Sequence, residues 1–225
     1  MSANKQGHVN ENRELSQLDK LQNWYETNGK KVNIALVVLF SLILLIIAYN
    51  NVYQPKQEAA AQDLLFKSQY WFDQDSIAKA LNDPSNGFLE IASSYSRTKA
   101  GNLAKYYAGI SYYQLGDFAN AEKYLGKFCP KHDEILGGLA IATLADAQME
   151  NGNQGGALKN YKKAANFSDN EASAPYLLLK AGLAHDYAGK PKDALTFFSK
   201  IEAEFPNSIE ASEAVKFIAK LEAAM

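Results

Sequence analysis

The hydropathy pattern contains one uninterrupted apolar block, over residues 32–49. It reads VNIALVVLFSLILLIIAY, without a charged side chain and with only Asn33 and Ser41 clearly polar. Eighteen helical residues extend about 27 Å, close to the hydrocarbon thickness of about 30 Å, and a helix that is apolar on all sides is typical of a membrane span. The pattern predicts a transmembrane helix over 32–49, after a polar tail over 1–31 and before a linker over 50–56 that contains Pro55.

The charges that flank this block predict its orientation. Lys30 and Lys31 directly precede it, whereas the first cation after it is Lys56. Because cytoplasmic flanks of membrane spans are enriched in Lys and Arg, we expect residues 1–31 to be cytoplasmic and everything after the span to lie on the other side. A cleaved signal peptide is disfavoured, since the polar stretch before the block is about thirty residues long and no small-residue cleavage site follows Ala48.

The second half of the chain is periodic. Three turn signatures begin at Gly116, Gly152 and Gly189, spaced 36 and 37 residues apart. Seven positions before each glycine stands a small residue: Gly109, Ala145 and Gly182. Five positions after each glycine stands an alanine: Ala121, Ala157 and Ala194. Four positions after each alanine stands a bulky residue: Leu125, Tyr161 and Phe198. This spacing predicts antiparallel helix pairs, in which small residues permit close approach, glycine forms a left-handed cap and the bulky residue fills the seam.

These positions resemble the tetratricopeptide repeat (TPR). Residues 102–130 match its pattern through Gly109, Tyr112, Gly116, Asp117, Phe118, Ala121 and Leu125, and Pro206 stands where the last unit should close. The departures are Lys105 at the bulky first site, Gln148 and His185 at the tyrosine site, and Phe128 and Ile201 at the last alanine site. The resemblance implies an all-α fold, with one N-terminal transmembrane helix followed by a TPR α-solenoid.

We expect this solenoid to occupy residues 57–225. A helix over 57–81, a breaker over 83–87 and a short helix ending at residue 95 indicate a degenerate first pair over 57–95. Repeats are expected over about 102–130, 138–170 and 175–206. A final helix over 208–223, with charged residues between its apolar ones, is typical of the cap that ends a solenoid.

The composition and the motifs give no sign of catalysis. The net charge of −2, from 23 Lys and Arg against 25 Asp and Glu, lacks the basic footprint of a nucleic-acid binder. The glycine-rich run 152–156 lacks the Lys-Ser/Thr of a phosphate-binding loop, and Cys129, the single cysteine, cannot build a disulfide or a cysteine zinc site alone. His8, His132 and His185 have no converging partners at helical spacing. We expect no enzyme, no cofactor and no metal site.

The TPR resemblance implies a binding surface on the concave face, formed by the first helix of each pair. Its residues would be Tyr106, Ile110, Tyr113, Asp146, Met149, Tyr176, Leu179, Leu183 and Asp186. Aromatic and Met side chains provide large contact areas, although several of these positions could instead be core between repeats. The Lys and Asn clamp of some relatives is not expected, because Tyr106, Ile110 and Thr143 occupy those sites.

The whole-chain layout resembles the YfgM-like family of bacterial inner-membrane proteins, most clearly over 87–116 and 174–189. That resemblance implies a single-pass protein with a cytoplasmic N-terminus and a periplasmic TPR domain. It further implies an ancillary role at the SecYEG translocon, beside a PpiD-like periplasmic chaperone, on exported proteins. The alternative is an assembly adaptor of an envelope complex for division, cytochrome maturation or secretion, which binds one fixed client through the same face.

Overall fold

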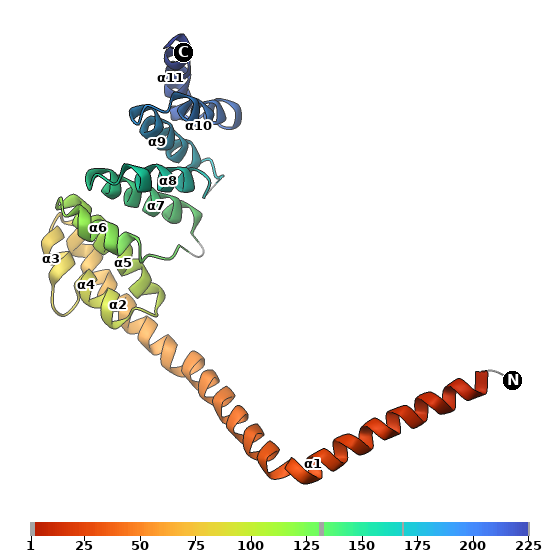
Figure 1. Cartoon of the computed structure of the whole chain (residues 1–225). Coiled ribbons are helices and arrows are strands. Elements are labelled where there is room, and N and C mark those ends of the chain that lie inside the picture. Colours follow the sequence, from red (N-terminus) through yellow and green to blue (C-terminus); the bar gives the residue numbers. More distant parts are fainter. Residues whose placement is uncertain (1–2, 131–132, 168, 225) are drawn as a thin grey trace. The chain divides into compact units, whose positions relative to one another are not determined.

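The computed structural model describes residues 3–130, 133–167 and 169–224, and their side chains from residue 17 onward. All regular secondary structure in these ranges is helical, which confirms the predicted fold class (Figure 1). The chain divides into two compact units, Met1–Lys56 and Gln57–Met225. The helices are α1 (Ala3–Ala48), η1 (Tyr49–Tyr53), α2 (Gln54–Asp73), α3 (Ile77–Asn82), α4 (Phe88–Ser94), α5 (Lys99–Gln114), α6 (Phe118–Leu125), α7 (Glu134–Glu150), α8 (Gln154–Ala165), α9 (Ala174–Tyr187), α10 (Pro191–Glu204) and α11 (Ile209–Ala224).

Helix α1 contains the apolar block and is long and apolar enough to cross a membrane. Its large apolar side chains are exposed rather than packed into a protein core. Both polar interruptions of the block have partners within the helix: the Ser41 hydroxyl donates to the Val37 carbonyl at 2.8 Å, and Asn33 Oδ1 accepts from the Tyr25 hydroxyl at 2.9 Å. Such pairing matters in hydrocarbon, where an unsatisfied polar group is costly.

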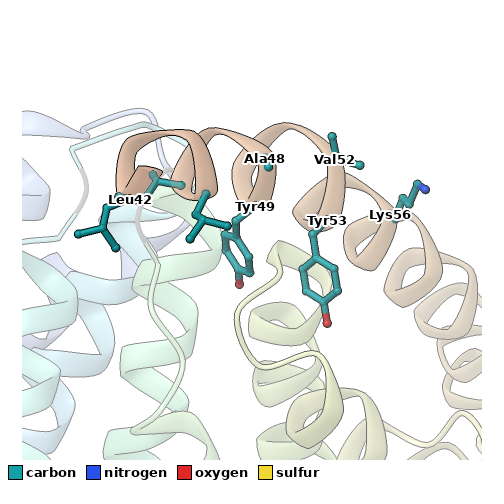
Figure 2. A pocket seen from close by; sticks show the side chains of 8 residues that line it. Leu42, Ala48, Tyr49, Val52, Tyr53 and Lys56 are labelled. Atoms are coloured by element: carbon teal, nitrogen blue, oxygen red, sulfur yellow. The ribbon is translucent and has the colours of Figure 1, made fainter. Parts of the chain in front are cut away.

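The segment over 50–56, expected as a linker, is helical. It passes through the π-helical turn η1, in which the Gln54 amide donates to the Tyr49 carbonyl five residues earlier. Pro55 explains this turn, because proline has no amide hydrogen and its ring crowds the carbonyl four residues before it. Tyr49 and Tyr53 stack with their ring centroids 5.4 Å apart, and Figure 2 shows both rings on the same side of the helix.

The prediction of one continuous helix over 57–81 is wrong, because a turn separates α2 from α3. Asp75 there has a positive φ of 55°, and the Ser76 amide donates to the Trp71 carbonyl at 2.9 Å. This bond closes a left-handed C-cap of the kind that glycine usually forms. Aspartate can adopt this conformation, although glycine does so far more often, so the sequence carries only a weak signal for the break.

The predicted glycine turns end the first helix of each of the three pairs, α5/α6, α7/α8 and α9/α10. Gly116, Gly152 and Gly189 have φ values of 76°, 77° and 70°. In each turn the residue after the glycine donates its amide to a carbonyl five residues earlier, as Asp117 does to Tyr112 at 2.9 Å. A Cβ at any of the three would meet no atom within 4 Å, so the backbone conformation, and not lack of space, demands glycine.

The seam of each helix pair brings a small residue against a bulky one. A Cβ at Gly109 would lie 2.5 Å from Leu125 Cγ, and one at Gly182 would lie 2.4 Å from Phe198 Cε1. In the middle pair Ala145 and Tyr161 share one buried cluster. The alanines Ala121, Ala157 and Ala194 are fully buried. The pairs are therefore held at a separation that larger residues at these positions would increase.

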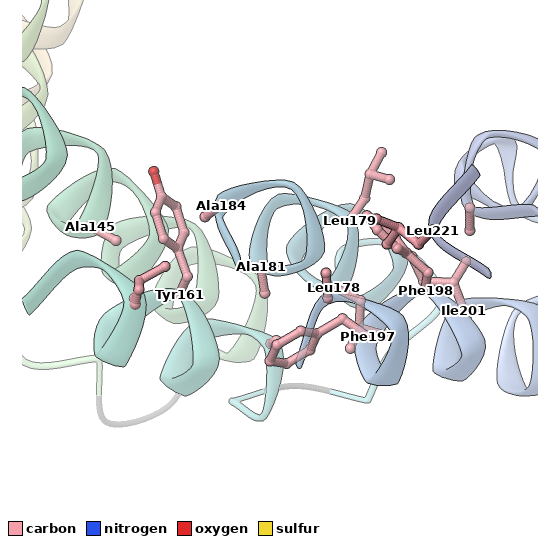
Figure 3. Close-up of a cluster of buried hydrophobic side chains, with 14 of the residues drawn as sticks. Ala145, Tyr161, Leu178, Leu179, Ala181, Ala184, Phe197, Phe198, Ile201 and Leu221 are labelled. Atoms are coloured by element: carbon pink, nitrogen blue, oxygen red, sulfur yellow. The ribbon is translucent and has the colours of Figure 1, made fainter. Parts of the chain in front are cut away.

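The first helices of successive units contact each other, as α5 contacts α7, α7 contacts α9, and α9 contacts α11. Within the described residues the second helices α6, α8 and α10 do not contact one another. The stack is therefore tighter on the side of the first helices, which makes that side its concave face. Figure 3 shows the hydrophobic core of these repeats, in which Leu178, Phe198 and Leu221 belong to one cluster.

Candidate functional site: the concave face

A carboxylate on α7 joins three helices at the concave face. One oxygen of Asp146 accepts a hydrogen bond of 2.5 Å from the Tyr161 hydroxyl on α8. The other lies 2.6 Å from Lys180 Nζ on α9. The Asp146 side chain is only 15% exposed and that of Lys180 25%, so the ion pair is partly shielded from water. Its geometry ties the second repeat to the third.

Tyrosine rings surround this ion pair. Lys180 Nζ lies 5.7 Å from the ring centroid of Tyr176 and 5.9 Å from that of Tyr161, distances at which a cation is attracted to an aromatic face. Burial and, next, the negative charge of Asp146 raise the pKa of Tyr113 on α5, so we group Tyr113 with this ion pair. We call Tyr113, Asp146, Tyr161, Tyr176 and Lys180 the tyrosine cluster.

Two tyrosines of this cluster, Tyr161 and Tyr113, have a raised pKa and keep their protons at neutral pH. Burial raises the pKa of Tyr161, and the hydrogen bond to Asp146 and the charge of Asp146 raise it further. Burial also raises the pKa of Tyr113, with the negative charge of Asp146 as the next cause. Both side chains are therefore neutral hydrogen-bonding groups, and neither is poised to act as a general base. The cluster is suited to contact rather than to proton transfer.

The structure brings three of the nine predicted face residues into this cluster: Tyr113, Asp146 and Tyr176. Tyr106 lies elsewhere: the centroid of its ring is 5.4 Å from that of the Phe128 ring. Burial, with smaller effects of Tyr107 and Asp133, raises the pKa of Tyr106 to about 12. Asp186 forms a separate, more exposed ion pair of 3.2 Å with Lys220.

The remaining four predicted face residues, Ile110, Met149, Leu179 and Leu183, lie outside the tyrosine cluster. Leu179 is 8% exposed and belongs to the core beside Phe198, so its assignment to the binding face is corrected. Met149 and Leu183 are half-buried and pack against the same core, and Ile110 is also half-buried.

Comparison with known proteins agrees with this architecture. Residues 22–171 match the family described as "Tetratricopeptide repeat-like domain", and residues 176–208 match the family described as "Tetratricopeptide repeat". The chain belongs to the tetratricopeptide repeat-like family. The first match starts before the apolar block of α1, so this block is part of the matched pattern. No curated protein matches the sequence significantly.

TPR domains are protein–protein interaction modules, and this one offers no metal centre among its described residues. The buried His185 directs Nδ1 to the Ala181 carbonyl at 2.8 Å, and its ring packs against Phe197, which accounts for it structurally. His132 and the side chain of His8 lie outside the described residues. Cys129 is exposed.

Two members of the tyrosine cluster were not anticipated as binding residues from the sequence. Tyr161 was assigned only to the seam, although its hydroxyl reaches Asp146. Lys180 was not singled out, although it is a lone cation within an apolar stretch of α9 and follows Asp146 by 34 residues, close to the repeat length. Residues about one repeat apart on adjacent first helices lie side by side, so this spacing was the signal that could have found the pair.

Pro206 also lies where the repeat pattern predicts a boundary. It is exposed in the turn between α10 and α11 and directly follows the half-buried Phe205, the first residue after α10. Proline cannot donate a helical hydrogen bond, which suits it to this position between two helices.

Proposed function

We propose that this protein is a non-catalytic, membrane-anchored adaptor that acts as an ancillary subunit of the Sec translocon on exported proteins. The observation that carries the proposal is the family match over 22–171, which joins the apolar helix and the repeats in one pattern. A module that binds proteins and is fixed to a membrane meets its clients at that membrane. The resemblance of 87–116 and 174–189 to the YfgM-like family supports SecYEG and a PpiD-like chaperone as the partners.

The charges at the two ends of the span support a periplasmic TPR domain in a bacterial inner membrane. Lys30 and Lys31 are exposed on α1 just before the apolar block, whereas Lys56 is the first cation after it. The N-terminus is then cytoplasmic by the positive-inside rule. At the opposite end of the span, the stacked rings of Tyr49 and Tyr53 suit the level of the lipid headgroups. In this proposal the single span over 32–49 is the part of the protein that contacts lipid.

The tyrosine cluster supplies the client-binding surface in this proposal. Tyr176 is 41% exposed, and Tyr113 is half-buried. Since Lys180 balances the charge of Asp146, the surface has no strong preference for charged clients. Rigid aromatic rings give contact area at little cost in side-chain entropy. These properties suit segments of varied sequence, such as exported chains that have not yet folded.

The test is a crosslinking pull-down from native membranes with two matched proteins. One is the full-length chain, and in the other the span over 32–49 is replaced by an unrelated polyleucine span. We expect translocon and chaperone subunits to be recovered with the native span and lost with the replacement. Absence of translocon components from both samples would contradict the proposal.

The same experiment decides the alternative of an envelope assembly adaptor. Such an adaptor binds one fixed client through the TPR domain, so its partner would survive replacement of the span. A double variant, Tyr113→Ala with Tyr176→Ala, then locates the binding site. The double variant is made both with the native span and with the polyleucine span. Loss of the partner from the double variant in both cases would establish the adaptor function in place of the translocon role.

A further inference from the structure

A second surface lies at the edge of the first repeat, away from the tyrosine cluster. It is a groove of about 610 Å³ between the turn that precedes α5 and the segment that follows α6. Its apolar lining comes from Leu103, Phe128, Pro130 and Leu136. A volume of this size falls in the range of protein binding pockets, which is about 300–1,000 Å³.

Hydrogen bonds fix both walls of the groove. The Asn102 side chain donates to the Cys129 carbonyl at 2.9 Å and accepts from the Cys129 amide at 3.0 Å. On the other wall, Lys105 Nζ donates to the Ser96 carbonyl at 3.2 Å. A groove whose walls are already fixed loses little conformational entropy when it binds a ligand.

The charge of the groove is strongly one-sided. Asp133 is the only carboxylate among the described lining residues. Four cationic side chains line the groove as well: Arg97, Lys99, Lys105 and Lys127. Lys99 and Lys127 form no ion pair within the part of the chain that the structure describes. The carboxylate of Glu58 lies nearby and keeps its negative charge, because its hydrogen-bond donors are the neutral backbone amides of Lys99 and Ala100, at 2.6 and 3.0 Å. The cations among the described lining residues still outnumber these carboxylates, so the rim carries a net positive charge.

We propose that this groove binds an acidic segment of a partner protein, in which apolar side chains alternate with carboxylates. The apolar side chains would enter the recess over Leu103 and Phe128, and the carboxylates would face Lys99 and Lys127 at its rim. A recessed apolar floor favours an extended peptide over the flat surface of an anionic membrane. The inference rests on the proposed function in one respect, that the ligand is a protein, and it specifies the chemistry of that ligand.

Cys129 provides a direct probe of this groove, because it is exposed, lines it and is the only cysteine of the chain. The assay measures how fast a maleimide alkylates Cys129 in the full-length protein in non-ionic detergent micelles. The probe is a synthetic octapeptide of alternating Glu and Leu. Two control peptides replace either every Glu by Lys or every Leu by Ser. We expect only the Glu-Leu peptide to slow alkylation, by about fivefold or more at saturation, since it alone matches both floor and rim.

A charge-reversal variant tests the role of the rim. Lys99→Glu with Lys127→Glu should weaken binding of the Glu-Leu peptide by about tenfold or more, because two attractive contacts become repulsive. The matched control is Lys159→Glu with Lys192→Glu, two exposed lysines on α8 and α10, which should leave the affinity within about twofold of wild type. Circular dichroism checks that both variants keep their helices.

Three results would overturn the inference. The Glu-Leu peptide could leave Cys129 alkylation unchanged, it could protect the charge-reversed protein as well as the wild type, or vesicles of anionic phospholipid could protect Cys129 where the peptide does not. Each of these three results is obtained with purified protein and a defined ligand. None of them would alter the outcome of the membrane pull-down, so failure of this inference is distinguishable from failure of the proposed function.

Discussion

The tyrosine cluster and the basic groove are two surfaces of one helical stack that handle charge in opposite ways. In the tyrosine cluster the charge of Asp146 is balanced by Lys180 on the next repeat. In the groove, Asp133 is the one carboxylate among the described lining residues, which also include Lys99 and Lys127. Helix α5 contributes to both, through Tyr113 near its C-terminal end and Leu103 near its start. The difference shows that one repeat scaffold carries a charge-balanced surface and a basic one, and the two proposals assign varied clients to the first and an acidic segment to the second.

The largest effect should come from a change that breaks the scaffold under both surfaces. Gly109→Val places a branched side chain where even a Cβ would lie 2.5 Å from Leu125 Cγ, and so forces α5 away from α6. We expect the free energy of unfolding to fall by about 3 kcal/mol, the upper end of the usual cost of overpacking a core. Urea denaturation followed by circular dichroism measures it.

The control for this prediction is Gly155→Val, at a position where a Cβ would meet nothing within 4 Å. It should change the free energy of unfolding by less than about 0.5 kcal/mol. Equal losses in the two variants would mean that the seam between α5 and α6 is not closely packed.

The next change removes the balanced charge from the tyrosine cluster. Asp146→Ala leaves Lys180 and the Tyr161 hydroxyl without their partner in a partly buried setting, and should cost about 1–3 kcal/mol of unfolding free energy. The matched variant Asp186→Ala breaks the more exposed pair with Lys220, whose side chain is 64% exposed, and should cost less than about 1 kcal/mol. The reverse ranking in thermal or urea unfolding would refute the role given to Asp146.

A smaller effect is expected when the wall of the groove is released. Asn102→Ala removes both hydrogen bonds to Cys129 and should cost about 0.5–1.5 kcal/mol of stability. The freed segment should also let maleimide alkylate Cys129 faster. Asn207→Ala, in the exposed turn before α11, serves as the control and should change neither quantity. An unchanged alkylation rate in Asn102→Ala would show that the wall is held by other contacts.

The buried tyrosines have the smallest effect on stability at neutral pH, because they lower the stability only at alkaline pH. Burial raises the pKa of Tyr106 to about 12 and raises the pKa of Tyr161 and Tyr113 above the ordinary value. Above pH 10, near the unfolded pKa, the folded protein binds more protons than the unfolded chain, so stability should fall as the pH rises from about 10 to 12.

Tyrosinate absorbance during an alkaline titration measures this effect. Tyr106→Phe should remove part of the late-titrating absorbance, because burial raises the pKa of Tyr106 to about 12. Unchanged late-titrating absorbance in this variant would contradict the burial of Tyr106.

The sequence predicts the helix pairs well because their signals are local. A left-handed cap requires a residue that tolerates positive φ, so Gly116, Gly152 and Gly189 mark the turns by residue type and spacing alone. The break at Asp75 was missed because aspartate rarely takes that conformation and gives no comparable signal. The π-helical turn at Tyr49–Tyr53 was missed for the converse reason, since Pro55 usually marks an interruption of a helix rather than a local widening of its turn.

The binding surfaces were less predictable, because they depend on contacts between repeats. The sequence placed Tyr113, Asp146 and Tyr176 on one face, but the partnership of Asp146 with Lys180 depends on how α9 lies against α7. Leu179 was misassigned because helical spacing cannot tell which first-helix positions the neighbouring unit covers. The groove was not foreseen, since Asn102 and Cys129 are 27 residues apart and meet only in the folded chain.

The most direct test of the central claim is site-specific photo-crosslinking in native membranes. A photoreactive amino acid replaces Tyr113 or Tyr176 in the tyrosine cluster, and, as controls, the exposed Lys159 or Lys192 on the second helices. We predict crosslinks to exported proteins and translocon-associated chaperone from the two tyrosine positions and none from the two lysine positions. Equal crosslinking from all four positions, or crosslinking from the lysines alone, would contradict the claim that the concave face binds the clients.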